Sequence, residues 1–323
     1  MLVQLDHLML QGVLLILLFS SIIYTNIIHA CDQTEHSSLL FFSLGLSSPL
    51  LNSTSLNCYH WEGITCNQNG WVTGLHLPSK GIQGDHFSSS LGNLTHLGYL
   101  NLSRNSLYGS LHQSQFFLSL NCLQILDLNY ILLSEELPVS LLSRNMIRMV
   151  KRVDLSSNHF QGSIPSSFFE QARTLLVSEL ETIPSQVFRA GYNNRSGLLP
   201  EDMYDATTLE QIALPVNSLY GVISDRIINL TNLTVPDLSS NGLSNMLPID
   251  IGKLSNLKFM LLHTNKLRTS LLPLSLMNCT NLIELNMRFN NFKGYISALN
   301  FSRFSQLTKL DIMSIITSLV SCQ

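Results

Sequence analysis

Four consecutive segments between residues 207 and 296 repeat one arrangement of apolar and polar positions. They read LEQIALPVNSLYGVI, LTVPDLSSNGLSNML, LKFMLLHTNKLRTSL and LIELNMRFNNFKGYI. In each segment two apolar residues, such as Ile212 and Leu214, lie on either side of one position that is free to vary. This alternation is typical of a β-strand with one buried face. The pattern therefore predicts a short strand in every segment.

An asparagine follows each predicted strand at a nearly constant interval. Asn217, Asn241, Asn265 and Asn290 stand 24, 24 and 25 residues apart. A short amide at this place can bond backbone groups that have no access to water inside a coil. The interval and the motif L-x-x-L-x-L-x-x-N-x-L are the signature of a leucine-rich repeat. We therefore predict an α/β leucine-rich-repeat solenoid, a horseshoe or superhelix with short parallel strands on its concave face.

The predicted repeats extend over residues 71–312, a length that accommodates about ten units. The pattern is degenerate near 121–146, where Ile131 replaces the asparagine, and near 173–187. Asn158 and Asn193 are 35 residues apart, which is neither one period nor two. Since each coil is stabilised by its neighbours, we expect this interval to divide the array into two weakly coupled blocks. Beyond it, Arg195 stands where an apolar residue is usual.

Residues 1–30 are typical of an export signal, with the apolar run GVLLILLFSSII and a small-residue cleavage site before Cys31. An uncleaved signal anchor is the alternative. Eight N-x-Ser/Thr sequons agree with export and predict glycosylation at Asn52, Asn93, Asn101, Asn194, Asn229, Asn232, Asn278 and Asn300. Residues 313–323 form a truncated non-repeat tail that is too short to span a bilayer. We expect a secreted or cell-surface glycoprotein on the extracellular side of the plasma membrane.

Residues 31–70 predict an N-terminal cap for the solenoid. The stretch SSLLFFSLGLSSPLL favours a short helix, and a segment rich in aromatic residues follows it. Without a cap the first coil would expose its apolar end. Cys31, Cys58 and Cys66 are candidate disulfide residues, because a disulfide can stabilise so small a unit.

The cap sequence C-x-x-W-E-G-I-T-C, followed by W-V-T-G-L-H-L, resembles plant extracellular leucine-rich-repeat receptors. The segments FRAGYNN, DIGKLSNLK and FNNFKGYISALNFSRFSQLTKLDI resemble segments of the receptors for tyrosine-sulfated peptides, which are related to the phytosulfokine receptors. The resemblance implies a receptor ectodomain. It also implies two adjacent cysteines before the tryptophan, but Tyr59 follows Cys58 here. We therefore expect competition between Cys31–Cys58 and Cys58–Cys66, with the shorter loop favoured by its lower closure entropy.

No catalytic chemistry is indicated. The chain lacks the phosphate-binding loop, the nucleophile elbow, the zinc-protease helix motif and the kinase signatures, so we expect no enzyme. The histidines show no metal-ligand spacing, and we expect no metal and no cofactor. A net charge of −3 gives no basic field for nucleic acid. With 45% apolar and 12% charged residues, the 323-residue chain has ample material for a core.

Outward strand positions on the concave face are the candidate ligand- or partner-binding residues, since exposed aromatic and arginine side chains favour protein contacts. According to their place in the repeat, they are Arg189, Tyr192, Gln211, Val216, Asp237, Phe259, His263, Glu284, Arg288 and Phe289. Arg189 and Arg288 are four coils apart, about 20 Å at a ~4.8 Å strand spacing. The strands therefore offer no arginine cluster that could hold a sulfate, and we expect no useful affinity for a sulfated peptide.

We conclude from the sequence that the chain is a truncated, non-catalytic ectodomain of a plant cell-surface peptide-receptor type, which binds a protein or peptide. Its partner would be a cell-surface protein or peptide, such as a receptor-like kinase. Contact with a membrane would run only through an uncleaved signal anchor or a missing C-terminal span. The alternative is a decoy or structural fragment, or the non-functional product of a degraded gene copy.

Overall fold

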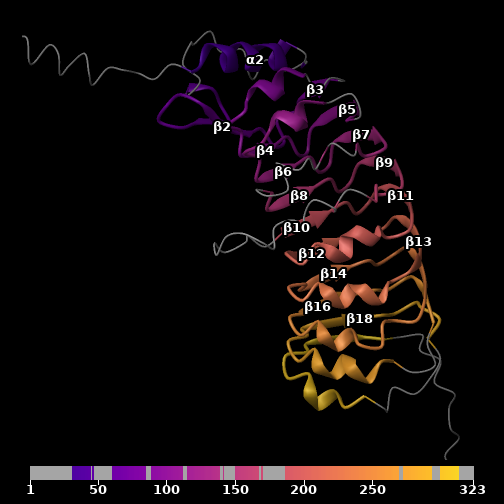
Figure 1. Cartoon of the computed structure of the whole chain (residues 1–323). Helices are drawn as coiled ribbons and strands as arrows, with labels where there is room; N and C mark the ends of the chain where they lie inside the picture. Colours follow the sequence, from indigo (N-terminus) through magenta and orange to yellow (C-terminus); the bar gives the residue numbers. More distant parts are fainter. Residues whose placement is uncertain are drawn as a thin grey trace, which may run out of the picture.

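The fold is taken from a computed structural model, which describes residues 31–44, 46, 60–84, 89–111, 115–138, 141, 150–166, 169, 186–268, 272–292 and 299–312. The predicted export signal at 1–30, Asn52, Cys58 and the tail at 313–323 lie outside the described residues. The coils stack into a curved column, and the N-terminal helix lies at one end of it (Figure 1).

The cap begins with the helix α2 (Gln33–Leu44), which places Leu39 and Phe42 in the core. Asp32 caps this helix, because its Oδ1 accepts hydrogen bonds from the backbone N–H groups of Thr34 and Glu35. The strand β1 (Ile64–Cys66) then pairs antiparallel with β2 (Val72–His76), the first strand of the solenoid. A helix is thus present before the first strand, but it begins at Gln33, four residues before the stretch that favoured it.

Cys31 forms a disulfide, whereas Cys66 carries a thiol. The favoured Cys58–Cys66 loop is therefore not the pairing found. Burial, together with the nearby charge of Glu35, raises the pKa of the Cys66 thiol to about 11.

One sheet of eleven strands lines the concave face. After β1 and β2 it contains β4 (Tyr99–Asn101), β6 (Ile125–Asp127), β8 (Arg152–Asp154), β10 (Gln186–Arg189), β12 (Leu209–Ala213), β14 (Val235–Asp237), β16 (Phe259–Leu261), β18 (Glu284–Asn286) and β19 (Lys309–Asp311). Every pair from β2 onward is parallel, and the strands follow one another in sequence order. The predicted solenoid with parallel concave strands is confirmed.

A second, eight-stranded sheet runs along the other side of the coils. Its strands are β3 (Gln83–Gly84), β5 (Ser106–Ser110), β7 (Leu132–Glu135), β9 (His159–Gly162), β11 (Asn194–Gly197), β13 (Ser218–Val222), β15 (Gly242–Asn245) and β17 (Lys266–Leu267). Short 3-10 helices complete the coils: η3 (Ser89–Asn93), η4 (Gln115–Ser119), η7 (Glu201–Asp205), η8 (Asp225–Asn229), η9 (Ile251–Lys253), η10 (Leu274–Asn278) and η12 (Phe301–Arg303). The consensus leucines between these elements, such as Leu214 and Leu285, form one continuous core.

The repeated asparagines form a ladder that joins neighbouring coils. Asn265 is representative: its Nδ2 donates to Leu238 O of the preceding coil at 2.9 Å and to Leu262 O at 3.1 Å. Its Oδ1 accepts from Leu243 N of the preceding coil at 3.0 Å. The residue just before each ladder position has a left-handed backbone, as at Val216 with a φ of 54°. The ladder therefore fixes both the turn and the stacking of the coils.

The array remains continuous across the long interval between Asn158 and Asn193. Strand β10 pairs with β8 in regular register, and Asn193 donates to Leu155 O of the earlier coil at 3.1 Å. Arg195 is fully buried and donates from its guanidinium to Gln161 O and Ser163 O. Strand pairing and ladder contacts therefore continue across the interval, and the weak coupling of two blocks, which concerns unfolding, stays a prediction.

Candidate functional site

The concave face of each coil carries two outward strand side chains, six and four residues before the ladder position. On β8 these are Arg152 and Asp154, and between them Val153 points into the core. Counted in the same way, Arg189 lies on β10 and Gln211 on β12. Because adjacent strands are parallel and in register, these side chains form rows across the sheet.

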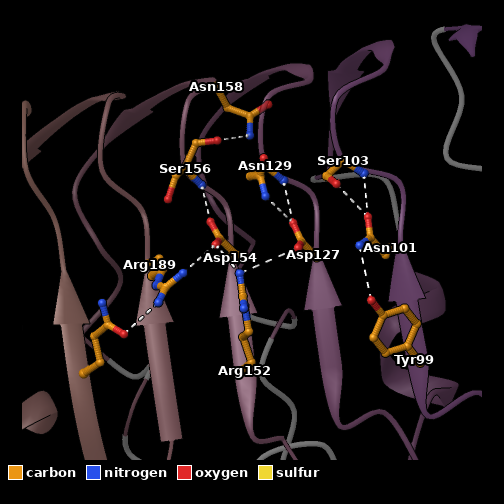
Figure 2. Close-up of polar contacts among 11 residues, drawn as sticks. Tyr99, Asn101, Ser103, Asp127, Asn129, Arg152, Asp154, Ser156, Asn158 and Arg189 are labelled. Carbon is orange, nitrogen blue, oxygen red and sulfur yellow. Dashed lines mark hydrogen bonds and ion pairs between the residues drawn. The ribbon is translucent and has the colours of Figure 1, made fainter. Parts of the chain in front are cut away.

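A cluster of charged and polar side chains crosses strands β6 to β12, and we call it the polar cluster: Asp127, Arg152, Asp154, Arg189 and Gln211 (Figure 2). Asp154 Oδ2 lies 3.0 Å from Arg152 Nη2 and 3.6 Å from Arg189 Nη1. Arg152 Nη2 also lies 3.8 Å from Asp127 Oδ2. Arg189 Nη2 donates to Gln211 Oε1 at 2.8 Å. The cluster therefore holds two guanidinium groups around one carboxylate.

The charges of the polar cluster are balanced, with two arginines and two aspartates. Burial raises the pKa of the Asp127 carboxyl above its usual range, and the charge of Asp154 adds to this. Hydrogen bonds from Asn129 and the charge of Arg152 act in the opposite direction. The Nε atoms of Arg152 and Arg189 are buried and have no hydrogen-bond partner among the described residues.

The structure corrects the expectation that the concave strands lack an arginine cluster. Arg152 and Arg189 lie on adjacent coils and share Asp154, although 37 positions separate them in the sequence. Sequence reasoning missed Arg152 because the long interval made the two coils look distant. The offset from the ladder asparagine, six residues for Arg152 and four for Arg189, was the signal that could have found the pair.

A second group of predicted residues meets near the other end of the sheet. Arg288 lies 3.3 Å from Asp311 Oδ2, and its guanidinium carbon lies 4.6 Å from the centre of the Phe289 ring. Glu284 lies next to Phe259 across β16 and β18, and it forms an ion pair with Lys309 at 2.7 Å. The predicted Phe259, Glu284, Arg288 and Phe289 thus lie close together, whereas Arg189 and Gln211 belong to the polar cluster.

Several predicted residues have a different position or role from the one expected. Tyr192, Val216 and Phe289 lie outside the strands, at the left-handed turn before the ladder asparagine, and remain exposed. Asp237 is engaged in its own turn, since its Oδ1 accepts hydrogen bonds from Ser239 N at 3.2 Å and Ser239 Oγ at 2.7 Å. His263 is half-buried beside Thr264, at 3.3 Å between Nδ1 and Oγ1.

The acidic and amide residues that end the strands share this turn. Each accepts a hydrogen bond from the backbone N–H two residues later, at Asn101, Asp127, Asp154, Asp237 and Asn286. These side chains therefore stabilise the exit from the strand. Their oxygens are therefore only partly available to a ligand.

The described sequons differ in accessibility. Asn93, Asn194, Asn229, Asn232, Asn278 and Asn300 are exposed. Asn101 is only 7% exposed, and it bonds Tyr99 and Ser103 on the concave face (Figure 2). Within the described residues there is no group of three His, Cys, Asp or Glu side chains that could hold a metal ion. Nor does that part of the chain contain a helix long and apolar enough to cross a bilayer.

Comparison with known sequences relates the chain to plant receptors. The leucine-rich repeat family model matches residues 149–170. Phytosulfokine receptor 1 of Arabidopsis thaliana is 34% identical over 179 residues, which cover 47% of this chain and 16% of the receptor. Receptor-like protein 3 of the same plant is 39% identical over 203 residues, covering 59% of this chain and 25% of that protein. The chain thus spans a quarter or less of the length of these curated relatives.

Solved structures with the same fold include receptor ectodomains. A crystal structure of a TDR receptor has a TM-score of 0.60 at 25% identity and covers 74% of this chain and 42% of its own. The plant peptide hormone receptor RGFR1 in complex with RGF2 has a TM-score of 0.55 at 26% identity, covering 71% and 41%. A plant ice-binding protein, 18% identical with a TM-score of 0.60 and coverages of 91% and 100%, shares the fold alone.

Proposed function

We propose that this leucine-rich-repeat solenoid is a non-catalytic binding segment of a plant cell-surface receptor, which holds a peptide or protein along its concave face. The observation that carries the proposal is the row of outward side chains on this face. It begins with Arg189 and Gln211 and continues through Phe259 to Glu284, and Arg288 and Phe289 follow in the exposed turn after β18. Ladder bonds and parallel pairing hold these side chains on a rigid frame, so little ordering is required on binding.

The polar cluster supports a ligand with hydrogen-bond acceptors. Arginine carries five donors, and the side chains of Arg152 and Arg189 are 38% and 33% exposed, so part of each remains accessible to a ligand. A backbone carbonyl of an extended peptide is an acceptor that fits there without excess charge, because Asp154 and Asp127 already balance both guanidinium groups. A sulfate would have to displace these carboxylates, so we expect no strong sulfate binding at this cluster.

An extracellular setting is supported by the similarity to plant receptor-like proteins and by the six exposed sequons. The relatives whose structures show the fold include a peptide hormone receptor in complex with its peptide. That binding is a property of the relative, and it makes a secreted peptide the first class of ligand to test for this chain.

The test is calorimetric titration of the secreted, glycosylated chain with a panel of synthetic plant-type secreted peptides, each with and without tyrosine sulfation. We expect saturable binding of at least one peptide, and at least about a tenfold loss of affinity in Phe289→Ser, which is about 1.4 kcal/mol. Tyr108→Ser removes an equally exposed aromatic residue from β5 on the other sheet and serves as the matched control.

Two results would overturn the proposal. Binding that is lost equally in Phe289→Ser and Tyr108→Ser would mean that the concave face is not the site. No binding by any peptide, together with association of the chain with a full-length receptor, would favour the decoy role instead. A strict requirement for sulfate would contradict the account of the polar cluster.

A further inference from the structure

Exposed apolar side chains gather on the second-sheet side of the C-terminal coils. The position five residues after the ladder asparagine carries Leu198, Val222 and Met246, spaced by 24 residues and exposed to 58%, 46% and 66%. Three residues beyond Met246, Ile249 is 78% exposed, and the equivalent residue of the next coil is Leu274. In the regular unit around Asn158 these two positions hold Ser163 and Ser166. The repeat itself therefore does not require apolar residues there.

Four of these side chains, those of Val222, Met246, Ile249 and Leu274, line one groove, which has a volume of about 1030 Å³. Val222 enters it from β13, Met246 follows β15, Ile249 lies two residues before the 3-10 helix η9, and Leu274 begins η10. The groove includes part of the coil that follows Asn265, where the interval to the next ladder asparagine is 25 residues instead of 24. Leu198 extends the apolar surface, since it lies against Gly221, where an added Cβ would be 2.4 Å from Leu198 Cδ2. Apolar surfaces of this kind on a soluble molecule mark interaction sites.

The polar rim of the groove is acidic. Asp225 and Asp250 line it, and none of its described lining residues is basic. The nearby cations are already engaged, because Lys253 bonds Asp250 at 2.8 Å and Arg226 bonds Glu201 and Asp205. Asp225 has no ion pair within the described residues. A basic side chain of a partner would therefore find a carboxylate at the edge of an apolar groove.

Two sequons flank this groove, and neither contributes its asparagine to the lining. The sequon residues Asn229 and Asn278 end the 3-10 helices η8 and η10, whose first residues, Asp225 and Leu274, line the groove. With a rise of about 2 Å per residue, each attachment point lies roughly 8 Å from the groove along its helix.

We propose that this groove binds an extended segment of a partner protein that inserts apolar side chains between Met246 and Leu274 and places a lysine or arginine against Asp225. The occupant follows from the combination of an apolar wall, an acidic rim and an open approach. Met246 is suited to this task, since its flexible thioether adapts to different apolar side chains. The groove is a second binding surface, and it does not depend on the concave face.

The experiment selects a random dodecapeptide library on the full glycosylated chain and then measures the enriched peptides by calorimetric titration. We expect peptides that combine Leu, Ile or Phe with Lys or Arg, and at least about a tenfold loss of affinity in Ile249→Ser. Asp225→Asn should weaken binding and reduce its dependence on salt. Leu118→Ser, which removes an exposed leucine from η4 in an early coil, is the matched control and should bind normally.

Other occupants give different results, each of which overturns the proposal. Enriched peptides that lack basic residues, or that bind equally well to Ile249→Ser, would exclude the groove as a site of this specificity. Sedimentation equilibrium that shows a dimer, dissociated by Ile249→Ser, would identify a second copy of the chain as the occupant. The chain's own tail would be the occupant if no peptide were enriched and if the backbone amides of the groove were protected from hydrogen exchange only while residues 313–323 are present.

Discussion

The ladder asparagine Asn265 allows a direct test of what holds the coils together. Replacing it with leucine puts an apolar side chain of similar size into a site that is only 8% exposed. The substitution removes the acceptor for Leu243 N and the donor for Leu238 O, both in the preceding coil, and the donor for Leu262 O. Leu243 is fully buried, so its N–H has no water to replace the lost partner.

The expected effect follows from the groups left without partners. An unpaired buried N–H or C=O destabilises the folded state by about 1–3 kcal/mol, and a carbonyl with a second lone pair less than an N–H. The Leu243 N–H loses its acceptor, at about 2 kcal/mol, whereas Leu238 O and Leu262 O keep Asn241 Nδ2 and Asn290 Nδ2 as donors, so each bond lost there counts about 0.5 kcal/mol. Burial of the leucine side chain subtracts about 1 kcal/mol, and we expect Asn265→Leu to lower the free energy of unfolding by about 2 kcal/mol.

Urea unfolding of the secreted chain, followed by circular dichroism, measures this difference if the slope with urea is unchanged. Asn256→Leu is the matched control. Asn256 also joins two coils, through a 2.9 Å bond to Thr231 O, but it is exposed, and water replaces the bond when it is lost. We expect less than about 1 kcal/mol there. Equal losses in the two variants would refute the reasoning, because burial would then not determine the strength of the ladder.

Three further predictions concern single buried groups. Burial lowers the pKa of Arg195 to about 10, so desolvation of its charge opposes folding at neutral pH. Arg195→Leu removes this charge but also the guanidinium donors of Gln161 O and Ser163 O, so we expect a loss of about 1–3 kcal/mol in urea unfolding at pH 7, and a variant more stable than wild type would contradict this. Burial raises the pKa of Glu35 to about 7, with Asp32 adding to the shift and the hydrogen bond from Val72 N opposing it, so stability should fall by up to about 3 kcal/mol as the pH rises from 4.5 to 7. His96 Nδ1 lies 4.0 Å from this carboxyl, and Glu35→Gln should flatten the profile; an unchanged profile would contradict the assignment to Glu35. Glycopeptide mapping of the secreted chain should find Asn101 unoccupied and Asn229 occupied, because the Asn101 amide is buried and bonded to Tyr99; equal occupancy would refute this.

The periodic part of the fold could be predicted because it depends on residues that recur. Leu214 and Asn217 recur at one interval with one chemistry, and this is sufficient to place a strand, a core face and a turn. The second sheet gave no such signal. Its strands, such as β11 and β15, are rich in Gly, Ser and Asn, and they form through backbone pairing between coils rather than through an alternating apolar pattern. Their existence follows from stacking, which a single unit does not reveal.

The candidate site was predicted only in part, since the outward positions vary freely and their partners lie in other coils. Gln211 and Arg189 were found by phase, but the carboxylate that joins Arg189 to Arg152 belongs to a coil on the far side of a 35-residue interval. Because outward positions vary independently of the core, one coil can contribute to two surfaces. Its strand contributes to the concave face, while residues a few positions after its ladder asparagine contribute to the groove, as Gln211 and Val222 do within one unit. Because the core and the ladder occupy the remaining positions, either surface can change its chemistry without altering the stacking. A substitution such as Ile249→Ser should therefore change binding at the groove and leave the concave face intact.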